Sequence, residues 1–373
     1  MYSKIRNYLK SYSDILYMLY FLPLAGCVAM GIGSDQLFYK GCFAVAIIFL
    51  LLKFLVTDYT KTELVFMSLI MLLLAYIFFR TREKALIITA LSVFGCKGVC
   101  VRRVLKYTFF VYIIGMMLTI SLVMAGKIQG EIHTLTKSGI QYQINDYGFS
   151  HPNSAYSHLM MIALMMVAVW QERVRWYHYG IMTIVMFAAY KVFLSRTGFY
   201  IYLVLCMTIG LLHIMRNNNI KKVFFFLFNL IPAGLLVLSY GLMINYHRGI
   251  SIINKLDKFL TGRIILSSKA YVNAGLSWFG AADRSWMNLI FIDNAYMSVL
   301  ISCGIVACVL CVIAYSLMCI RYWKAEEYYV VIVLGIIAVY AFMEYIVVNA
   351  TWNPLLLFMS GTLSWNRKKM DCQ

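Results

Sequence analysis

Residues 107–126 read YTFFVYIIGMMLTISLVMAG, a run without a single charged side chain. The hydrocarbon core of a bilayer is about 30 Å thick, and a helix of roughly 20 apolar residues crosses it. This run therefore predicts a transmembrane helix. The rest of the chain has the same character, since 62% of its 373 residues are hydrophobic and only 13% are charged. So few charges cannot cover a soluble domain of this size, which excludes a soluble enzyme and a nucleic-acid-binding module.

Similar apolar runs recur along the chain and predict about twelve transmembrane helices. The longest, residues 181–215, would form a helix of about 52 Å, which is too long for one crossing. We therefore divide it into two helices at Ser195-Arg196-Thr197-Gly198. The other predicted spans are 14–33, 37–56, 64–79, 85–96, 107–126, 154–170, 222–241, 294–320, 328–348 and 354–364. The predicted fold is all-α, a single multi-pass membrane domain covering residues 1–373.

The basic side chains predict how the chain is oriented in the membrane. The net charge of +18 comes from 33 Lys and Arg, which form short clusters between the apolar runs. Cytoplasmic loops carry the excess of such residues. The side that holds both chain ends is the richer one, so both termini are predicted to be cytoplasmic. Segments 127–153, 195–198 and 242–292 are then predicted to lie outside.

Residues 242–292 form the longest predicted outer loop. Apolar side chains recur at helical spacing in 252–260 and again in 264–271, with charged residues between them. This pattern is typical of amphipathic helices that lie on a membrane surface. We therefore predict a large extracytoplasmic loop that carries two surface helices.

Arginines on the outer side are candidates for binding an anion. Arg196 stands at the break in the long apolar stretch, and Arg248 and Arg263 lie in the large loop. Each could be an ordinary interfacial or solvated charge. A guanidinium also binds a phosphate through two parallel hydrogen bonds, and a ligand with two phosphates would use more than one of them. These arginines are therefore the candidate anion ligands.

Two carboxylates and a histidine are candidates for acid–base chemistry. Asp293 opens the predicted span 294–320, where helix capping alone could explain it, but it is also well placed for a general base. Glu344 lies near the outer end of span 328–348, and a carboxylate that deep is a functional candidate. His151 precedes Pro152, which suits the first turn of a helix. Asp293, Glu344 and His151 all stay open as the base.

Several short motifs occur in a characteristic order. They are Gly-Phe-Ser-His-Pro-Asn at 148–153, Ser-Arg-Thr-Gly at 195–198, Gly-Arg at 262–263 and Asp-Asn-Ala-Tyr at 293–296, followed by Gly304-Ile305 and by Glu344 and Asn353 near the last outer turn. From about residue 100 onward, this order resembles the O-antigen and capsular polysaccharide polymerases of the Wzy type. The related O-antigen ligases usually carry a His near the position of Asp293. The Asp at this position therefore favours a polymerase.

The resemblance implies a metal-independent glycosyltransferase in the cytoplasmic (inner) membrane of a bacterium. It would move a growing polysaccharide from undecaprenyl diphosphate to a sugar hydroxyl of an incoming lipid-linked unit, without a metal ion or other cofactor. Arg196, Arg263 and Arg248 would hold the diphosphate, and Asp293 would take the proton. The residues implied to position sugar or diphosphate are His151, Asn153, Asn294, Tyr296, Glu344 and Asn353.

The resemblance also implies partners, namely membrane lipid, a chain-length regulator and a flippase of the same pathway. The composition excludes nucleic acid as a partner. The alternatives are a ligase-like transferase and a transporter or flippase of lipid-linked oligosaccharide. A transporter usually shows internal repeats and charges at the membrane midplane. We find no clear repeat in this sequence.

Overall fold

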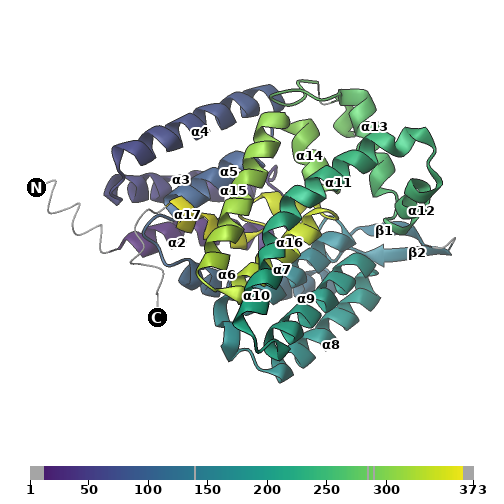
Figure 1. Cartoon of the computed structure of the whole chain (residues 1–373), viewed down its shortest axis with the longest axis horizontal. Coiled ribbons are helices and arrows are strands. Elements are labelled where there is room, and N and C mark those ends of the chain that lie inside the picture. The colour runs from purple at the N-terminus through teal and green to yellow at the C-terminus, as the bar shows by residue number, and fades with distance from the viewer. Residues whose placement is uncertain (1–11, 138–139, 284, 289, 364–373) are drawn as a thin grey trace, which may run out of the picture. The chain divides into compact units, whose positions relative to one another are not determined.

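The computed structural model describes residues 12–363 except 138, 139, 284 and 289 (Figure 1). The described chain is predominantly helical and falls into two compact units. The first combines Met1–Asp58, Ser92–Gly210 and Thr351–Gln373, and the second combines Tyr59–Leu91 and Leu211–Ala350. Both chain ends lie outside the described residues, so their predicted cytoplasmic placement stays a prediction.

The first unit contains a helical bundle and a β-hairpin. Tyr17 and Tyr20 of α2 both bond to Ser92, at 2.8 and 2.9 Å, and α2 packs on α3 and α6. Its elements are α2 (Ser13–Ala29), α3 (Leu37–Val56), α6 (Val101–Met124), β1 (Ile132–Lys137), β2 (Ile140–Asn145), α7 (Pro152–Trp170), η1 (Gln171–Arg173), α8 (Trp176–Phe193), η6 (Pro354–Met359), α17 (Ser360–Leu363) and most of α9 (Arg196–Ile214).

The second unit is built around α16, whose side chains are nearly all buried. Gly335 of α16 lies directly against the ring of Phe228, where any larger residue would collide. Its elements are α4 (Lys61–Thr81), α10 (Asn218–Phe226), η2 (Leu227–Leu230), α11 (Ile231–Asn245), η3 (Tyr246–Arg248), α12 (Ser251–Phe259), α13 (Arg263–Ala274), η4 (Ser285–Asn288), α14 (Ala295–Ser302), α15 (Ile305–Lys324), α16 (Tyr328–Ala341) and η5 (Tyr345–Val348). Helix α5 (Ala85–Gly95) spans the boundary between the units.

Seven helical segments of the described chain are long and apolar enough to cross a membrane, rather than about twelve. They are Leu37–Val56, Lys61–Thr81, Val101–Met124, Pro152–Arg173, Arg196–Ile214, Asn218–Arg248 and Ile305–Lys324. Segment Lys61–Thr81 has a mean hydropathy of 2.2 and buries only Ile77 and Thr81, as expected of a surface that faces lipid. The structure therefore fits a helical membrane protein with several spans.

The remaining predicted spans are shorter or less apolar than expected. Tyr328–Ala341 has 14 residues, which makes a helix of about 21 Å, short of the roughly 30 Å of a bilayer core. Span 294–320 is divided at Gly304, where φ is +93°, so only Ile305–Lys324 reaches full length. Hydropathy along the sequence does not reveal such interruptions, which explains the overestimate.

Two further differences concern the segments predicted to lie outside. Strands β1 and β2 pair antiparallel from Ile132↔Asn145 to Lys137↔Ile140, so the described chain is not purely α-helical. Helices α12 and α13 form where amphipathic helices were predicted. However, Ile253, Leu260 and Ile264 are buried in an apolar cluster, so this part of 242–292 is packed into the second unit rather than forming a separate loop.

Gly304 provides a test of how α14 is joined to α15. A Cβ added there would collide with the backbone of Trp278, Phe279 and Gly280, and its φ of +93° is one that other residues rarely adopt. We therefore expect Gly304→Ala to destabilise the protein by about 1–3 kcal/mol or more. Gly241→Ala, in α11, meets no atom within 4 Å and should change stability by less than about 1 kcal/mol. The midpoints of thermal unfolding of both variants in detergent would measure the loss of stability. Equal midpoints would contradict the close backbone contact at Gly304.

Candidate functional site

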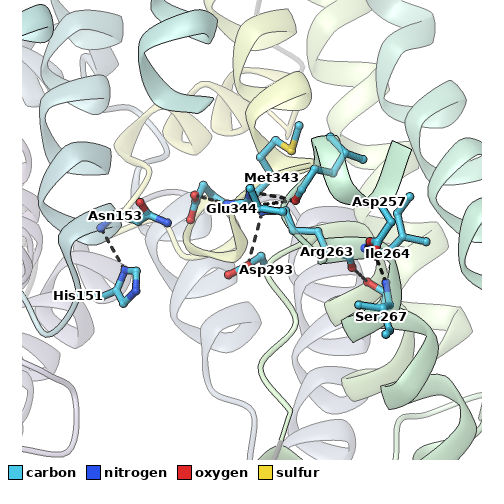
Figure 2. Close-up of polar contacts among 12 residues, drawn as sticks. His151, Asn153, Asp257, Arg263, Ile264, Ser267, Asp293, Met343 and Glu344 are labelled. Carbon is cyan, nitrogen blue, oxygen red and sulfur yellow. Dashed lines mark hydrogen bonds and ion pairs between the residues drawn. The ribbon is translucent and has the colours of Figure 1, made fainter. Parts of the chain in front are cut away.

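The candidate site in the second unit is centred on Arg263, the first residue of α13 (Figure 2). The chain turns sharply between α12 and α13, with left-handed backbone at Thr261 (φ 58°) and Gly262 (φ 82°). Asp257 fixes this turn, because its Oδ1 accepts hydrogen bonds from the backbone N–H groups of Ile264 (2.8 Å) and Ile265 (3.1 Å). The turn thereby directs the Arg263 side chain into the unit.

The guanidinium of Arg263 is almost completely enclosed by protein acceptors. Its Nε donates to the carbonyl oxygen of Met343 (2.9 Å), its Nη1 to the hydroxyl of Thr261 (3.0 Å) and its Nη2 to Oε1 of Glu344 (3.1 Å). Nε also lies 3.5 Å from Oδ2 of Asp293. Only 7% of the side chain is exposed, so Arg263 is a paired, buried cation rather than an open anion ligand.

The two carboxylates beside Arg263 come from different elements. Asp293 precedes α14, and Glu344 follows the end of α16. Burial raises the pKa of Glu344 to about 8, with Arg263 acting in the opposite direction and Asp293 in the same one. Burial also raises the pKa of Asp293, against the effect of Arg263, although 27% of that side chain is exposed. The more exposed Asp293 is therefore better placed to exchange a proton with a ligand.

A small cavity adjoins this cluster. It is lined mainly by apolar side chains of α11 and α13 and of the residues that directly follow α12 and α16. Its polar lining residues are Ser239, Arg263, Ser267 and Asn294. Such a mixture, apolar with a few convergent polar groups, is typical of ligand-binding sites. The cavity has room for about one water-sized sphere, which is too small for a sugar or a phosphate.

Two residues of the Asp-Asn-Ala-Tyr motif have structural contacts. Asn294 caps α14, because its Oδ1 accepts from the N–H of Met297 (3.1 Å), and its Nδ2 donates to Ser239 (2.9 Å). The Tyr296 hydroxyl donates to the carbonyl oxygen of Ala338 (2.9 Å) in α16. Both side chains are buried, and these contacts hold α14 in place beside α11 and α16.

His151 and Asn153 lie in the first unit, at the start of α7. His151 is the N-cap of this helix, since its Nδ1 accepts from the N–H of Asn153 at 3.1 Å (Figure 2). The sequence pattern explained Pro152 as a helix-start residue and left His151 unexplained. The structure shows that capping accounts for one of the two ring nitrogens of His151.

Arg196 lies at the same end of the first unit. It is the first residue of α9 and is exposed, and the break that precedes it falls at Leu194 (φ 51°), close to the predicted 195–198. The ring of Tyr147 contacts that of Phe193 at 5.8 Å between centroids, and Gly198 lies against Tyr156 of α7. The N-termini of α7 and α9 therefore share one end of this unit.

The other two predicted site residues have simpler surroundings. Arg248, at the end of η3, is exposed, and the described residues include no ion pair to its side chain. Asn353 precedes η6 in the first unit and is fully buried. Its carbonyl oxygen accepts from the N–H of Leu356 (3.1 Å), so it begins that helical turn.

No protein family model matches this sequence, and neither a characterised protein nor a solved structure shows significant similarity to it. The residues of the sequence motifs form two groups in the structure. The first group, Arg263, Asp293 and Glu344, is brought together in the second unit. The second group, His151, Asn153 and Arg196, is gathered at one end of the first unit.

The raised pKa of Glu344 predicts a pH-dependent stability. Because its pKa rises from 4.5 to about 8 on folding, the folded state holds more protons than the unfolded state between these values. Stability from this group therefore falls as pH rises from about 5 to 8, at up to about 1.4 kcal/mol per pH unit. Thermal unfolding should show the wild type losing stability relative to Glu344→Gln as pH rises over this range, because the variant has no carboxyl group to titrate at this position.

The exposed Glu172 provides a control, since Glu172→Gln should keep a constant difference from the wild type. A constant difference for Glu344→Gln as well would show that the Glu344 carboxyl titrates normally in the folded protein.

Proposed function

We propose that this chain is a membrane glycosyltransferase that polymerises lipid-linked oligosaccharide repeat units. The observation that carries the proposal is the pairing of one buried guanidinium, Arg263, with two carboxylates, Asp293 and Glu344, from separate segments. All three residues belong to the motifs that resemble Wzy-type polymerases. A titratable cluster with raised carboxyl pKa values, beside a partly apolar cavity, is typical of a site for proton transfer.

The proposed substrate is an oligosaccharide joined to a polyprenyl diphosphate such as undecaprenyl diphosphate. A hydroxyl of the incoming unit attacks the anomeric carbon of the growing chain, and a glycosidic C–O bond forms there. The bond between that carbon and the diphosphate oxygen breaks, and the lipid diphosphate leaves with the electron pair. Asp293 takes the hydroxyl proton, as a general base must to make the oxygen nucleophilic.

The contacts of Arg263 support a positioning role for this residue. Its N–H groups already have acceptors on Met343, Thr261 and Glu344, so the guanidinium orients the carboxylates instead of opening toward a phosphate. Exposed arginines are better suited to the diphosphate. Arg196 has the backbone N–H groups of the α9 N-terminus beside it, which favour an anion, and Arg248 offers a second exposed guanidinium.

The membrane arrangement is part of the proposal. The protein would lie in the cytoplasmic membrane of a bacterium with its termini inside and segment 242–292 outside. In this orientation the predicted outer segments carry His151 and Arg196 of the first unit and Arg263 of the second. The proposed pathway is O-antigen, capsule or exopolysaccharide synthesis, with a flippase that supplies the repeat units and a chain-length regulator as partners.

The decisive experiment is an assay of the purified protein with lipid-linked repeat units, analysed by gel for products of increasing length. A ladder of products would support a polymerase. A single transfer to another glycan would indicate a ligase, and movement across vesicles without new bonds would indicate a flippase.

Asp293→Asn tests the proposed base. Asn cannot accept the hydroxyl proton, and a general base contributes about 10²- to 10⁴-fold, so turnover should fall at least about 100-fold while substrate binding persists. The matched control is Asp283→Asn, because Asp283 is an exposed residue of the same unit. Unchanged turnover in Asp293→Asn would transfer the role of base to Glu344 or His151.

Arg196→Ala tests the proposed diphosphate contact. Loss of a charge-assisted hydrogen bond costs about 1.5–3 kcal/mol, so kcat/KM for the lipid-linked donor should fall by about tenfold to a hundredfold. Arg216→Ala is the matched control, because Arg216 is also exposed and follows the other end of α9. An equal effect of both substitutions would show that general surface charge, and not a site at Arg196, governs donor binding.

A further inference from the structure

Three side chains with potential metal ligands meet at the open end of the β-hairpin. Ile132 pairs with Asn145, so the preceding Glu131 lies opposite the following Asp146. Their backbones continue the ladder, with the N–H of Asp146 donating to the carbonyl oxygen of Glu131 at 3.0 Å. His133 is two residues from Glu131 and therefore lies on the same face of the hairpin. The antiparallel register alone brings the three side chains together.

The three groups are close enough to share one ion. One ligand atom from each of Glu131, His133 and Asp146 lies within 4.8 Å of the others. The nearest pair, Nε2 of His133 and Oδ2 of Asp146, is 3.3 Å apart. Two ligand atoms that are each about 2.0–2.2 Å from a tetrahedral zinc ion lie roughly 3.3–3.6 Å apart, so this separation fits two neighbouring ligands of one ion.

The Asp146 carboxylate is held in a fixed orientation. Its Oδ1 accepts from the backbone N–H groups of Glu131 and Gly148, each at 2.9 Å, which leaves Oδ2 directed toward His133. Only 2% of this side chain is exposed, compared with 25% for His133. Hydrogen bonds of this kind orient the ligands in metal sites and are part of what gives such sites their affinity.

Charge also favours a cation at this place. Two carboxylates, one of them buried, lie beside a single imidazole that is neutral in its metal-binding form. Two neighbouring carboxylates attract a positive ion, and the Asp146 carboxylate is buried while Glu131 is exposed. One imidazole nitrogen with carboxylate oxygens is a donor set suited to zinc and similar divalent transition metals.

We propose that Glu131, His133 and Asp146 bind one divalent transition metal ion of the zinc type, with a fourth position open to water or another ligand. His151 lies next to this site, since its ring centroid is 5.4 Å from that of His133. We treat it as a neighbour and not as a ligand, because its Nδ1 already accepts a hydrogen bond from the N–H of Asn153.

The ion would fix the connection from the hairpin to α7. This connection contains Tyr147 (φ 51°), Gly148 (φ 87°) and Ser150 (φ 63°), and a left-handed backbone is unfavourable for residues other than glycine. Asp146 links the hairpin to this connection, because it closes the hairpin and its Oδ1 accepts a hydrogen bond from the N–H of Gly148. A metal ion bound to Asp146 would therefore fix the position of the α7 N-terminus relative to the hairpin.

The test is zinc binding by the purified full chain in detergent micelles after removal of metal with EDTA. Calorimetry should show one saturable Zn²⁺ site per chain, and Co²⁺ in its place should give the visible absorption of a four-coordinate ion. His133→Gln and Glu131→Gln should each weaken binding at least tenfold. His247→Gln, at an exposed histidine of the second unit, should leave binding unchanged.

Several outcomes would overturn the proposal. They are the absence of saturable Zn²⁺ binding, equal affinity of wild type and His133→Gln, and displacement of Zn²⁺ by millimolar Mg²⁺, which would indicate a carboxylate-only surface site. The His133 side chain is partly exposed, so His133→Gln should fold, and size-exclusion chromatography would verify this. Binding is measured without lipid-linked sugar, so its failure would not bear on the proposed glycosyltransferase.

Discussion

The Arg263 guanidinium is a charge that the second unit can bury only because acceptors surround it. Leaving a buried charge unpaired costs about 3–5 kcal/mol, a large part of a typical protein's stability. The backbone after α16 and the carboxylates of Asp293 and Glu344 must therefore stay close to the α12–α13 turn. This requirement explains why part of segment 242–292 is packed against the unit, with Ile253, Leu260 and Ile264 burying the apolar side of the same turn.

The long apolar helices were predictable because they are determined by a local property, the length of an uncharged run. Helices α12 and α13 were also predictable from a local property, the spacing of their apolar residues. The number of spans was not predictable from hydropathy, since Gly304 divides an apolar run through its backbone conformation. The hairpin was not predicted. Part of its signal is present, because β2 alternates apolar and polar residues and follows the pair Ser138-Gly139, but β1 shows no such alternation.

The sequence predicted which residues form the candidate site better than it predicted the role of each one. Arg263, Asp293 and Glu344 stood out as charges in an apolar chain, but their pairing with one another depends on contacts between distant segments. Asp257 could not be recognised, because an aspartate on an amphipathic helix is usually a solvated residue, whereas here it caps the next helix. The grouping of Glu131, His133 and Asp146 was not predictable, since only the hairpin register brings these residues together.

The pairing of Arg263 has a consequence for how an anionic substrate could be bound. If its guanidinium turned toward a phosphate, it would have to leave Glu344 and the carbonyl oxygen of Met343, both of them in a buried environment. The new bonds would then replace existing ones, and the net gain in binding energy would be small. Arg196 is exposed and makes no ion pair within the described part of the chain, so binding an anion would cost it mainly contacts with water. The buried arginine is thus suited to setting the protonation of the carboxylates, and the exposed arginines to meeting the charged headgroup of a lipid.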